Sequence, residues 1–310
     1  MSAPRRGARV DATVVIPTRA DARAAARVEQ LAASIHDYPV LVVCNRERRP
    51  PGLDAGGIRT IMVPGGGVAR ARNVAMAVTR SEWVVFVDDD VILERNTIDA
   101  LLTNGDRTAA TIATARVLAA PRDDAEGAIY RDYLIFDRGA DPAMWGHGHL
   151  RISSPFDSWK LGVGAAFAVC LPSLRALRVQ AAFDESLSNG RFAGGAEDVD
   201  FFFQVIGAGG TVRYSPEALA YHIFPCGSLA LRRKLRQYFL ADGAYYAKWW
   251  SARSRRDLVG EARGWFGRVA RHLVRRIQRS PSLPILSLLA EPAYKLTGGV
   301  VWHLRRSLSC

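Results

Sequence analysis

The first 105 residues alternate short apolar runs with stretches of helical periodicity, and this alternation limits the available folds more than any other feature of the chain. The apolar runs end at turn-forming residues such as Pro17 and the glycines of 65–67, as buried strands do. Strands that alternate with helices predict an α/β fold, with a mostly parallel sheet and helices on both faces. The expected strands are 12–16, 38–45, 58–63 and 83–88, and the expected helices are 21–35, 68–78 and 95–105.

The same kind of segment continues beyond residue 105. Further strands are expected at 110–119, 163–170 and 210–216, and a helix is expected to start near Glu197. The chain has 310 residues, of which 49% are hydrophobic, so it can bury a substantial core.

Three consecutive carboxylates, Asp88, Asp89 and Asp90, follow the apolar run 83–87. Like charges this close repel one another and are costly to bury unpaired. Ligands of parallel α/β sheets bind beyond the carboxyl ends of the strands, so a divalent metal with an anionic substrate would explain the cluster. The alternative is a solvated acidic turn, in which Asp90 opens a helix that begins near Glu94.

The segment 64–73, PGGGVARARN, joins an expected strand to an expected helix. Its glycines allow the backbone to approach a ligand closely, and the helix N-terminus, Arg70 and Arg72 offer donors to an anion. The segment matches neither a Walker A nor a dinucleotide fingerprint. A turn followed by a helix with two surface arginines is therefore an equally good interpretation.

A second acidic cluster, Glu197, Asp198 and Asp200, follows Gly194 and Gly195 and opens an apolar helix. The helix dipole favours acidic residues in a first turn, but this explains one carboxylate better than three. A carboxylate presented by a flexible loop at a helix start can act as a general base.

Three histidines are weaker candidates. His222 follows an expected strand and could be a metal ligand or a core histidine. His147 and His149 lie in a glycine-rich loop, where surface histidines are the simpler interpretation.

The net charge of +12 is unevenly distributed. Residues 225–310 carry 17 Lys and Arg against 4 Asp and Glu, whereas residues 1–224 carry 25 against 26. We place a domain boundary at this change of charge, with a catalytic domain at 10–224 and a basic helical region at 225–310. Within 10–224, we expect a nucleotide half at about 10–120 and an acceptor half at about 121–224.

Residues 261–279 place apolar side chains on one helical stripe and arginines on the remainder. Such a helix fits the interface of an anionic membrane, and Trp249 and Trp250 can lie at headgroup depth. Residues 281–302 are apolar but interrupted by prolines, and no run of 18 apolar residues exists to span a membrane. The alternative is that the stripe packs on the catalytic domain. A nucleic-acid role would follow from charge alone, but no nucleic-acid-binding motif supports it.

The cysteines show neither metal-ligand nor redox spacing, and Cys44 and Cys170 fit free buried thiols. The N-terminal residues lack the long apolar stretch of a signal peptide. We therefore expect a reduced, cytoplasmic protein that lies peripherally on the inner face of the plasma membrane.

The order of the motifs resembles that of family 2 glycosyltransferases, which have the GT-A fold. The resemblance covers roughly residues 12–224 and rests on VVIPTR, ARARN, VFVDDDV, FDESL, GGAEDVDFFFQ and YSPEALAYH in that order. It implies a Rossmann-like, mainly parallel mixed sheet flanked by helices.

The resemblance also implies roles for individual residues. Pro17, Thr18 and Arg19 would line the nucleotide pocket, while Arg72 and Asn73 would brace the nucleotide and the acidic motif. Asp198 would be the catalytic base, with Glu197 beside it. The resemblance further implies that the sugar donor is bound by Asn45, Asp88 and Asp89. It also implies that Mn²⁺ or Mg²⁺ is bound by Asp90, Asp88 and His222.

Two departures from the family pattern concern the substrates. The second strand of the family commonly ends in an acidic turn that helps to read the nucleobase, whereas Asn45 stands here. Asparagine can still hydrogen-bond a pyrimidine edge. The glycines often found before the FDE motif are replaced by Ala181 and Ala182, so the acceptor loop is expected to differ.

The expected function is metal-dependent, inverting transfer of a sugar from a nucleotide-diphosphate sugar to an acceptor hydroxyl. The expected acceptor is a lipid-linked glycan of the cell envelope. Three alternatives stay open: a soluble small-molecule acceptor, a nucleotidyltransferase, and a non-catalytic basic protein that binds nucleic acid.

Overall fold

The computed structural model describes residues 10–19, 22–46, 58–65, 67–122, 127, 129–130, 136–178, 180–188, 194–224, 227–250, 254–278 and 285–307. The strands are β1 (Ala12–Thr18), β2 (Val40–Cys44), β3 (Arg59–Met62), β4 (Trp83–Val87), β5 (Val91–Leu93), β6 (Ile112–Ala119), β7 (Ala143–Gly146), β8 (Ala166–Cys170) and β9 (Thr211–His222). The helices are α1 (Ala22–Ser34), α2 (Val68–Val78), α3 (Thr97–Arg107), α5 (Leu171–Arg175), α6 (Glu197–Gly207), α7 (Ser228–Lys248), α8 (Ser254–Ile277) and α9 (Ile285–Ser307), with 3₁₀ helices η2 (Pro155–Leu161) and η3 (Glu185–Leu187).

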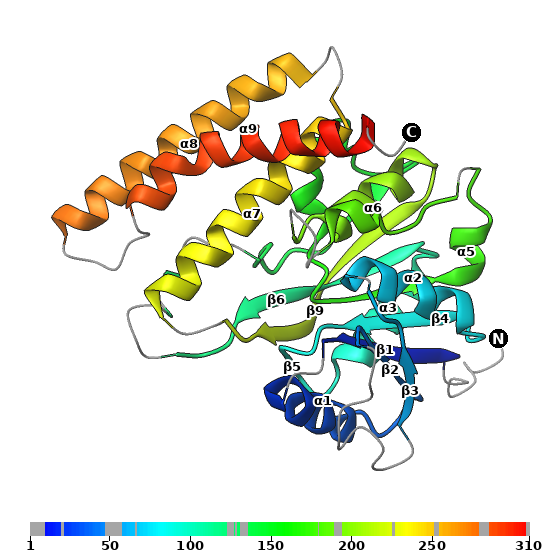
Figure 1. Ribbon diagram of the computed structural model, residues 1–310. Coiled ribbons are helices and arrows are strands. Elements are labelled where there is room, and N and C mark those ends of the chain that lie inside the picture. The colour runs from blue at the N-terminus through cyan, green and yellow to red at the C-terminus, as the bar shows by residue number, and fades with distance from the viewer. Residues whose placement is uncertain are drawn as a thin grey trace.

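The strands form one sheet in the order β3-β2-β1-β4-β8-β6-β9-β5, and β7 pairs with β9 beside this path (Figure 1). The segment β3-β2-β1-β4 is parallel, and β6 and β9 are also parallel. Strand β8 runs antiparallel to β4 and β6, and β5 and β7 run antiparallel to β9. The sheet is therefore mixed, with its parallel part concentrated in the N-terminal half of the chain.

Apolar side chains cover both faces of this sheet. Val14 and Ile16 of β1 pack in a cluster with residues of α1 and α3, such as Val28 and Leu101. Val15, on the opposite face of the same strand, packs in a second cluster with residues of α2 and α6. Because successive side chains of a strand point to opposite faces, an uninterrupted apolar run such as 14–16 requires helices on both sides. The predicted α/β class is confirmed.

The structure also contains elements that the sequence pattern did not indicate. Strand β5 follows the three aspartates directly and pairs Val91 with His222 of β9. The expected helix begins only at Thr97, so the interpretation of Asp90 as the residue that opens a helix near Glu94 is wrong. Strand β9 is longer than the expected strand at 210–216 because it pairs with β6 along its whole length, with an irregularity between Ala115 and Arg116.

Helix α7 packs on the body of the protein. Its Tyr245 hydroxyl donates to the Ser158 hydroxyl of η2 at 2.9 Å, and Lys248 lies 2.8 Å from the buried carboxylate of Asp200. Trp249 adds an indole hydrogen bond of 2.7 Å to the same carboxylate. The helix that follows the predicted boundary at residue 224 is thus joined to residues of η2 and α6 by buried polar contacts.

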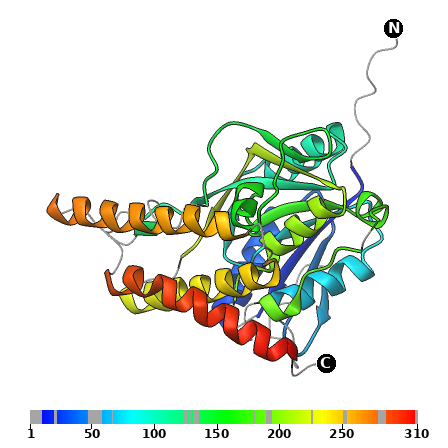
Figure 2. The ribbon, with the colours of Figure 1, turned by 90° about the horizontal axis from the view of Figure 1, so that it is seen from above.

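Helices α8 and α9 lie next to each other and extend past the edge of the sheet (Figures 1 and 2). Helix α9 is continuous through Pro292, one of the prolines that interrupt the apolar sequence of 281–302. A proline inside a helix cannot donate to the carbonyl four residues earlier, here Leu288. The Trp265 indole of α8 donates to that carbonyl at 2.9 Å and replaces the missing hydrogen bond.

Most of the predicted stripe of α8 is not packed on the catalytic domain. Phe266, Leu273, Val274 and Ile277 are all more than half exposed. None of the helices in the described part of the chain combines the length and apolar character that crossing a membrane requires.

Cys44 and Cys170 are free and buried, as predicted. Cys226 and Cys310 lie outside the described residues.

Candidate active site

Several predicted donor-binding residues meet at the carboxyl ends of β1, β2 and β4. Parallel pairing sets Thr18 beside Cys44, and the backbone N–H of Asn45 donates to the Thr18 carbonyl at 2.9 Å. The Thr18 hydroxyl donates to the carboxylate of Asp89, while the Arg27 Nε donates to the Asp89 carbonyl at 3.0 Å. The predicted residues at 17–19, 45 and 88–90 therefore lie at one edge of the sheet.

Arg72 of α2 connects the two acidic motifs. Its guanidinium donates to the Asp88 carboxylate at 2.8 Å and to the Glu197 carboxylate at 3.1 Å. The side chain is 1% exposed and its guanidinium carbon lies 5.4 Å and 5.5 Å from the ring centroids of Phe167 and Phe183. Arg70, two residues earlier, is exposed. Of the two arginines, Arg72 is the one that contacts both acidic motifs.

Gly164 links this arginine to Asp198. Its carbonyl accepts from Arg72 at 2.8 Å, and its amide donates to the Asp198 carboxylate. A side chain at this position would meet the Asp198 Cβ at 2.5 Å, so the close approach requires glycine. Asp198 also accepts from the Val199 amide at 2.8 Å, which fixes its carboxylate at the N-terminus of α6.

The three acidic residues of α6 have different environments. Glu197 is 4% exposed and lies against Arg72, and its second carboxylate oxygen has no hydrogen-bond partner among the described residues. Asp200 faces Lys248 and Trp249 of the α7 end. Asp198 alone is partly exposed to solvent. The three carboxylates at the start of α6 therefore face three different environments, which the helix dipole alone does not explain.

The charge balance at this edge favours a cation. Burial raises the pKa of Asp88 to about 8, even though the Arg72 guanidinium acts to lower it, and the carboxylates of Asp90, Asp89 and Glu197 add to the increase. Burial likewise raises the pKa of Glu197 to about 7 against the opposing influence of Arg72. One guanidinium does not offset the whole cluster, and an additional positive charge would stabilise its ionised form.

His222 lies next to Asp90. Its Nε2 is 3.4 Å from the Asp90 carboxylate. The pairing of Val91 with His222 between β5 and β9 holds these two side chains close together. Burial lowers the pKa of His222, which favours the neutral imidazole that a metal requires. In the described part of the chain, no group of three or more His, Cys, Asp or Glu side chains is arranged to hold a metal ion. Asp90 and His222 could supply two ligands, and the remainder would have to come from a substrate or water.

Sequence reasoning missed a contribution from α7. Burial lowers the pKa of Lys234, but the influence of Tyr238 and of the carboxylates of Asp90 and Asp88 outweighs it and raises the pKa. The ammonium group lies 4.9 Å from the centroid of the Tyr238 ring. A lysine four residues before a tyrosine is a common helical pair, and nothing in the sequence distinguishes Lys234 from the adjacent Arg232 and Arg233.

Asn73 and the loop histidines lie in other environments. The Asn73 amide donates to the Phe183 carbonyl at 2.9 Å and accepts from the Phe183 amide at 3.0 Å, so it holds the segment before Asp184. His147 and His149 are exposed after β7. The Ala69 backbone N–H in the first turn of α2 donates to the Ser188 hydroxyl at 3.1 Å and is therefore already paired within the protein.

Comparisons with known proteins agree with this architecture. The family model described as "Glycosyl transferase family 2" matches residues 51–149. The "Pre-mycofactocin glycosyltransferase" of two Mycobacterium tuberculosis strains, CDC 1551 / Oshkosh and ATCC 25618 / H37Rv, is 29% identical over 221 residues, which is 68% of this chain. The chain matches 42% of the length of these relatives.

A crystal structure of Staphylococcus aureus TarS residues 1–349 in complex with UDP resembles the fold. The TM-score is 0.50 at 13% identity, and the match covers 96% of this chain and 92% of that chain. The family model and the curated relatives confirm the predicted resemblance to family 2 glycosyltransferases. The TarS structure confirms the predicted GT-A type of fold.

Proposed function

We propose that this chain, which carries a family 2 glycosyltransferase domain, transfers a sugar from a nucleotide-diphosphate sugar to an acceptor hydroxyl with inversion of configuration. The observation that carries the proposal is the double ion pair of Arg72. It holds the acidic cluster after β4 and the acidic start of α6 at one site, although the two are more than 100 residues apart in the sequence.

The donor would bind at the carboxyl ends of β1, β2 and β4. Asn45 offers a side-chain oxygen that has no partner among the described residues, and Thr18 and Arg19 lie beside it. The UDP complex of the TarS structure supports a nucleotide-sugar donor. Lys234 would add a positive charge for the donor diphosphate, because it interacts electrostatically with Asp88 and Asp90.

Mn²⁺ or Mg²⁺ would fit between the donor and the acidic cluster. Asp90 and the neutral His222 are the side chains that could hold the ion, whereas Asp88 already pairs with Arg72. When bound, the ion supplies positive charge to the departing diphosphate. Burial, with the neighbouring carboxylates, raises the pKa of Asp88, and a bound cation would stabilise the ionised form of this cluster.

Asp198 would take the proton of the acceptor hydroxyl. Its carboxylate is held by the amides of Gly164 and Val199, and its partial exposure leaves it open to a substrate. A single base that assists direct attack at the anomeric carbon inverts its configuration. Glu197 would serve as a positioning residue, because its carboxylate is buried against Arg72.

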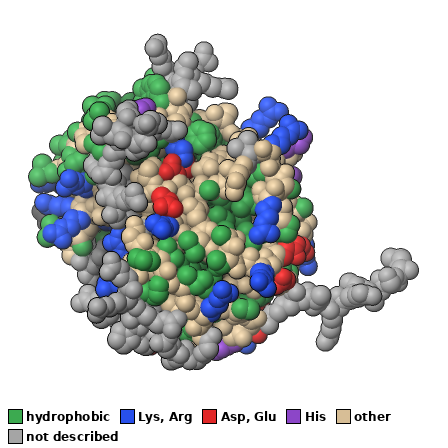
Figure 3. Space-filling view, turned by 45° about the vertical axis from the view of Figure 1, so that its right-hand side comes forward, with side chains coloured by type: hydrophobic (Ala, Val, Ile, Leu, Met, Phe, Trp, Pro, Cys, Tyr) green, Lys and Arg blue, Asp and Glu red, His purple; other side chains and the backbone are tan. Residues whose placement is uncertain are grey.

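The acceptor would be a lipid-linked glycan at the cytoplasmic face of the plasma membrane. Exposed apolar residues of α8 alternate with exposed Arg263, Arg271 and Arg276, as in a helix that binds an anionic interface. Figure 3 shows hydrophobic and basic side chains next to each other at the left edge of the molecule, where acidic side chains are scarce.

A soluble small-molecule acceptor is the second candidate. The curated relatives are named for pre-mycofactocin and not for a lipid-linked glycan, so their name leaves room for this alternative. Binding of the intact chain to anionic vesicles would separate the candidates, because a soluble acceptor does not require it. Absence of binding at low salt would contradict the membrane assignment.

The reaction is tested by nucleoside diphosphate release from UDP-, GDP- and dTDP-sugars, with and without Mn²⁺. We expect metal-dependent release from one donor for the wild type and its loss in Asp90→Asn. Asp106→Asn, an exposed substitution on α3, serves as the control. Release that is the same for wild type and Asp90→Asn would contradict the proposal.

A further inference from the structure

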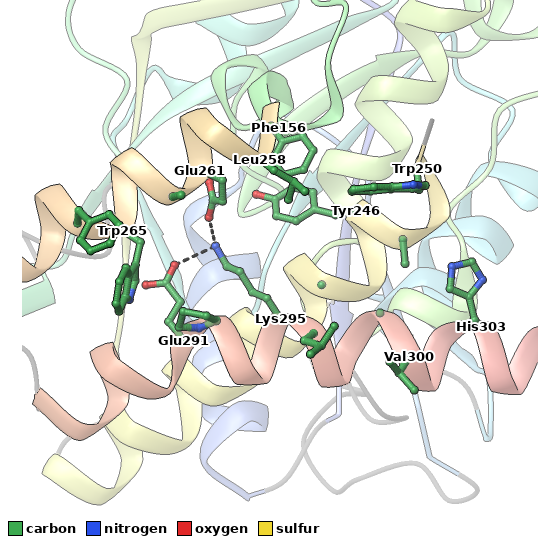
Figure 4. A pocket seen from close by; sticks show the side chains of 17 residues that line it. Phe156, Tyr246, Trp250, Leu258, Glu261, Trp265, Glu291, Lys295, Val300 and His303 are labelled. Atoms are coloured by element: carbon green, nitrogen blue, oxygen red, sulfur yellow. Dashed lines mark hydrogen bonds and ion pairs between the residues drawn. The ribbon is translucent and has the colours of Figure 1, made fainter. Parts of the chain in front are cut away.

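A pocket of about 680 Å³ lies between α7, α8 and α9, away from the acidic edge of the sheet. Its walls are mainly aromatic and aliphatic, with Phe156 of η2, Tyr246 of α7, Trp250 just after α7, and Trp265 of α8 (Figure 4). The Phe156 and Tyr246 rings stack at 4.1 Å. The volume lies in the range of pockets that bind small organic ligands.

The charged groups of this pocket are paired with one another. Lys295 lies against Glu261 and is 2.9 Å from Glu291 (Figure 4). Its ammonium group is also 3.5 Å from the Asp242 carboxylate. The Arg268 Nε donates to Glu291 at 3.1 Å. Because these charges neutralise one another, the pocket offers an occupant apolar contact, and a charged ligand would have to break existing ion pairs.

The pocket is continuous with an exposed apolar surface. Phe266 is 64% exposed and Leu296 is 71% exposed, and both line the pocket. Beyond them, α8 carries exposed Leu273 and Ile277 beside its exposed arginines. A hydrocarbon chain attached to an anionic phosphate would complement both features.

Helix α7 connects this pocket to the proposed active site. Tyr238, next to Lys234, is eight residues before Tyr246, which corresponds to about 12 Å along the helix at 1.5 Å per residue. Phe156 is also close in sequence to Gly164, which contacts Asp198. An acceptor could therefore place its hydroxyl at Asp198 and its apolar chain in the pocket.

We propose that the pocket between α7, α8 and α9 binds the hydrocarbon chain of a lipid-linked acceptor. This inference rests on the proposed transfer function, because it assigns the apolar part of the acceptor of that reaction. The occupant is defined by its chemistry, an alkyl or prenyl chain linked to phosphate.

Binding is tested with a bromine-labelled dodecyl phosphate, because bromine quenches tryptophan fluorescence on contact and Trp250 and Trp265 line the pocket. We expect saturable quenching of the full-length wild type. Ala262→Phe places a ring in the pocket and should weaken binding about tenfold, since about two methylenes of the chain would lose their burial. Ala270→Phe is the matched control, because Ala270 is also exposed on α8 but does not line the pocket.

Binding that is equal in Ala262→Phe and Ala270→Phe, or no saturable quenching of the wild type, would overturn the inference. Val300→Phe, which fills the pocket from α9, should reproduce the effect of Ala262→Phe if the pocket is the binding site.

A second measurement compares transfer to octyl- and dodecyl-linked acceptors. The KM of the wild type should fall with chain length, and Ala262→Phe should abolish this dependence without changing the KM of the donor. A KM that is independent of chain length would overturn the assignment to the acceptor. If no acceptor or donor supports transfer but the probe binds as expected, the proposed function fails and the apolar-chain site stands.

Discussion

Arg72 donates to the carboxylate of Glu197 at 3.1 Å, and both side chains are almost completely buried. The same guanidinium pairs with Asp88, so one residue of α2 fixes the end of β4 relative to the start of α6. The relative position of the two acidic motifs is thus a property of the folded core rather than of flexible loops.

Arg72→Met should destabilise the protein by about 3–5 kcal/mol, because it leaves the buried carboxylate of Glu197 and the partly buried carboxylate of Asp88 without their partner. Chemical denaturation measures this change. Arg72→Met combined with Glu197→Gln should recover part of the stability but not the transfer activity. Arg70→Met, on the exposed side of the same helix, is the control and should change stability by less than about 0.5 kcal/mol. Equal effects of the two arginine substitutions would contradict the assigned role.

The raised pKa values of Glu197 and Asp88 predict a pH dependence of stability. The ordinary pKa of a glutamate is 4.5, and that of Glu197 in the folded protein is about 7. Between these two pH values, the folded protein retains a proton on Glu197 that the unfolded chain releases. For Asp88 the window extends from 3.8 to about 8. The metal-free protein should therefore lose stability as pH rises through these windows. Glu197→Gln should reduce the slope, as measured by denaturation at several pH values. An unchanged slope would show that Glu197 does not retain the proton.

The hydrogen bond from Trp265 to the Leu288 carbonyl should depend on Pro292. Trp265→Phe is expected to cost about 1 kcal/mol of stability, because it leaves that carbonyl without a donor. In a Pro292→Ala background, the new backbone N–H can donate to Leu288, and the cost should decrease. A double-mutant cycle measures this coupling, and strictly additive effects would contradict the account.

The crossing of α7 and α9 should tolerate no side chain at Gly298. A Cβ there would lie 2.0 Å from the Leu240 carbonyl oxygen, and one at Gly243 would lie 1.8 Å from the Lys295 carbonyl oxygen. Gly298→Ala should cost about 1–3 kcal/mol and increase proteolysis of α9. Gly267→Ala on α8, where nothing lies within 4 Å, should instead stabilise the helix by up to about 1 kcal/mol. Stabilisation by both substitutions would disprove the close packing.

The sequence was sufficient to predict the helices and strands that have strong local patterns. The strands β1, β2 and β4 and the helices α2 and α6 follow from apolar runs, glycines and acidic helix starts. It was insufficient for β5 and β7, because a three- or four-residue strand is defined by its partner β9 and not by its own composition.

The candidate site shows the same limit. Arg70 and Arg72 are equivalent in the sequence, and only the packing of α2 determines which one is buried. The position of Lys234 depends on how α7 docks, through Tyr245, Lys248 and Trp249, on residues distant in sequence. Asn73 matched the family pattern, but its amide is used by the Phe183 backbone, which no local pattern could indicate.

The measurement that tests the account most directly separates donor binding from transfer. Binding of the donor nucleotide with Mn²⁺ is measured by calorimetry, and transfer is measured in a single turnover, for wild type, Asp90→Asn and Asp198→Asn. We predict that Asp198→Asn binds the nucleotide like the wild type but transfers at least about 100-fold more slowly, as loss of a general base does. Asp90→Asn should lose metal-dependent binding. Transfer by Asp198→Asn at the rate of the wild type would contradict the claim that the two acidic motifs form one active site.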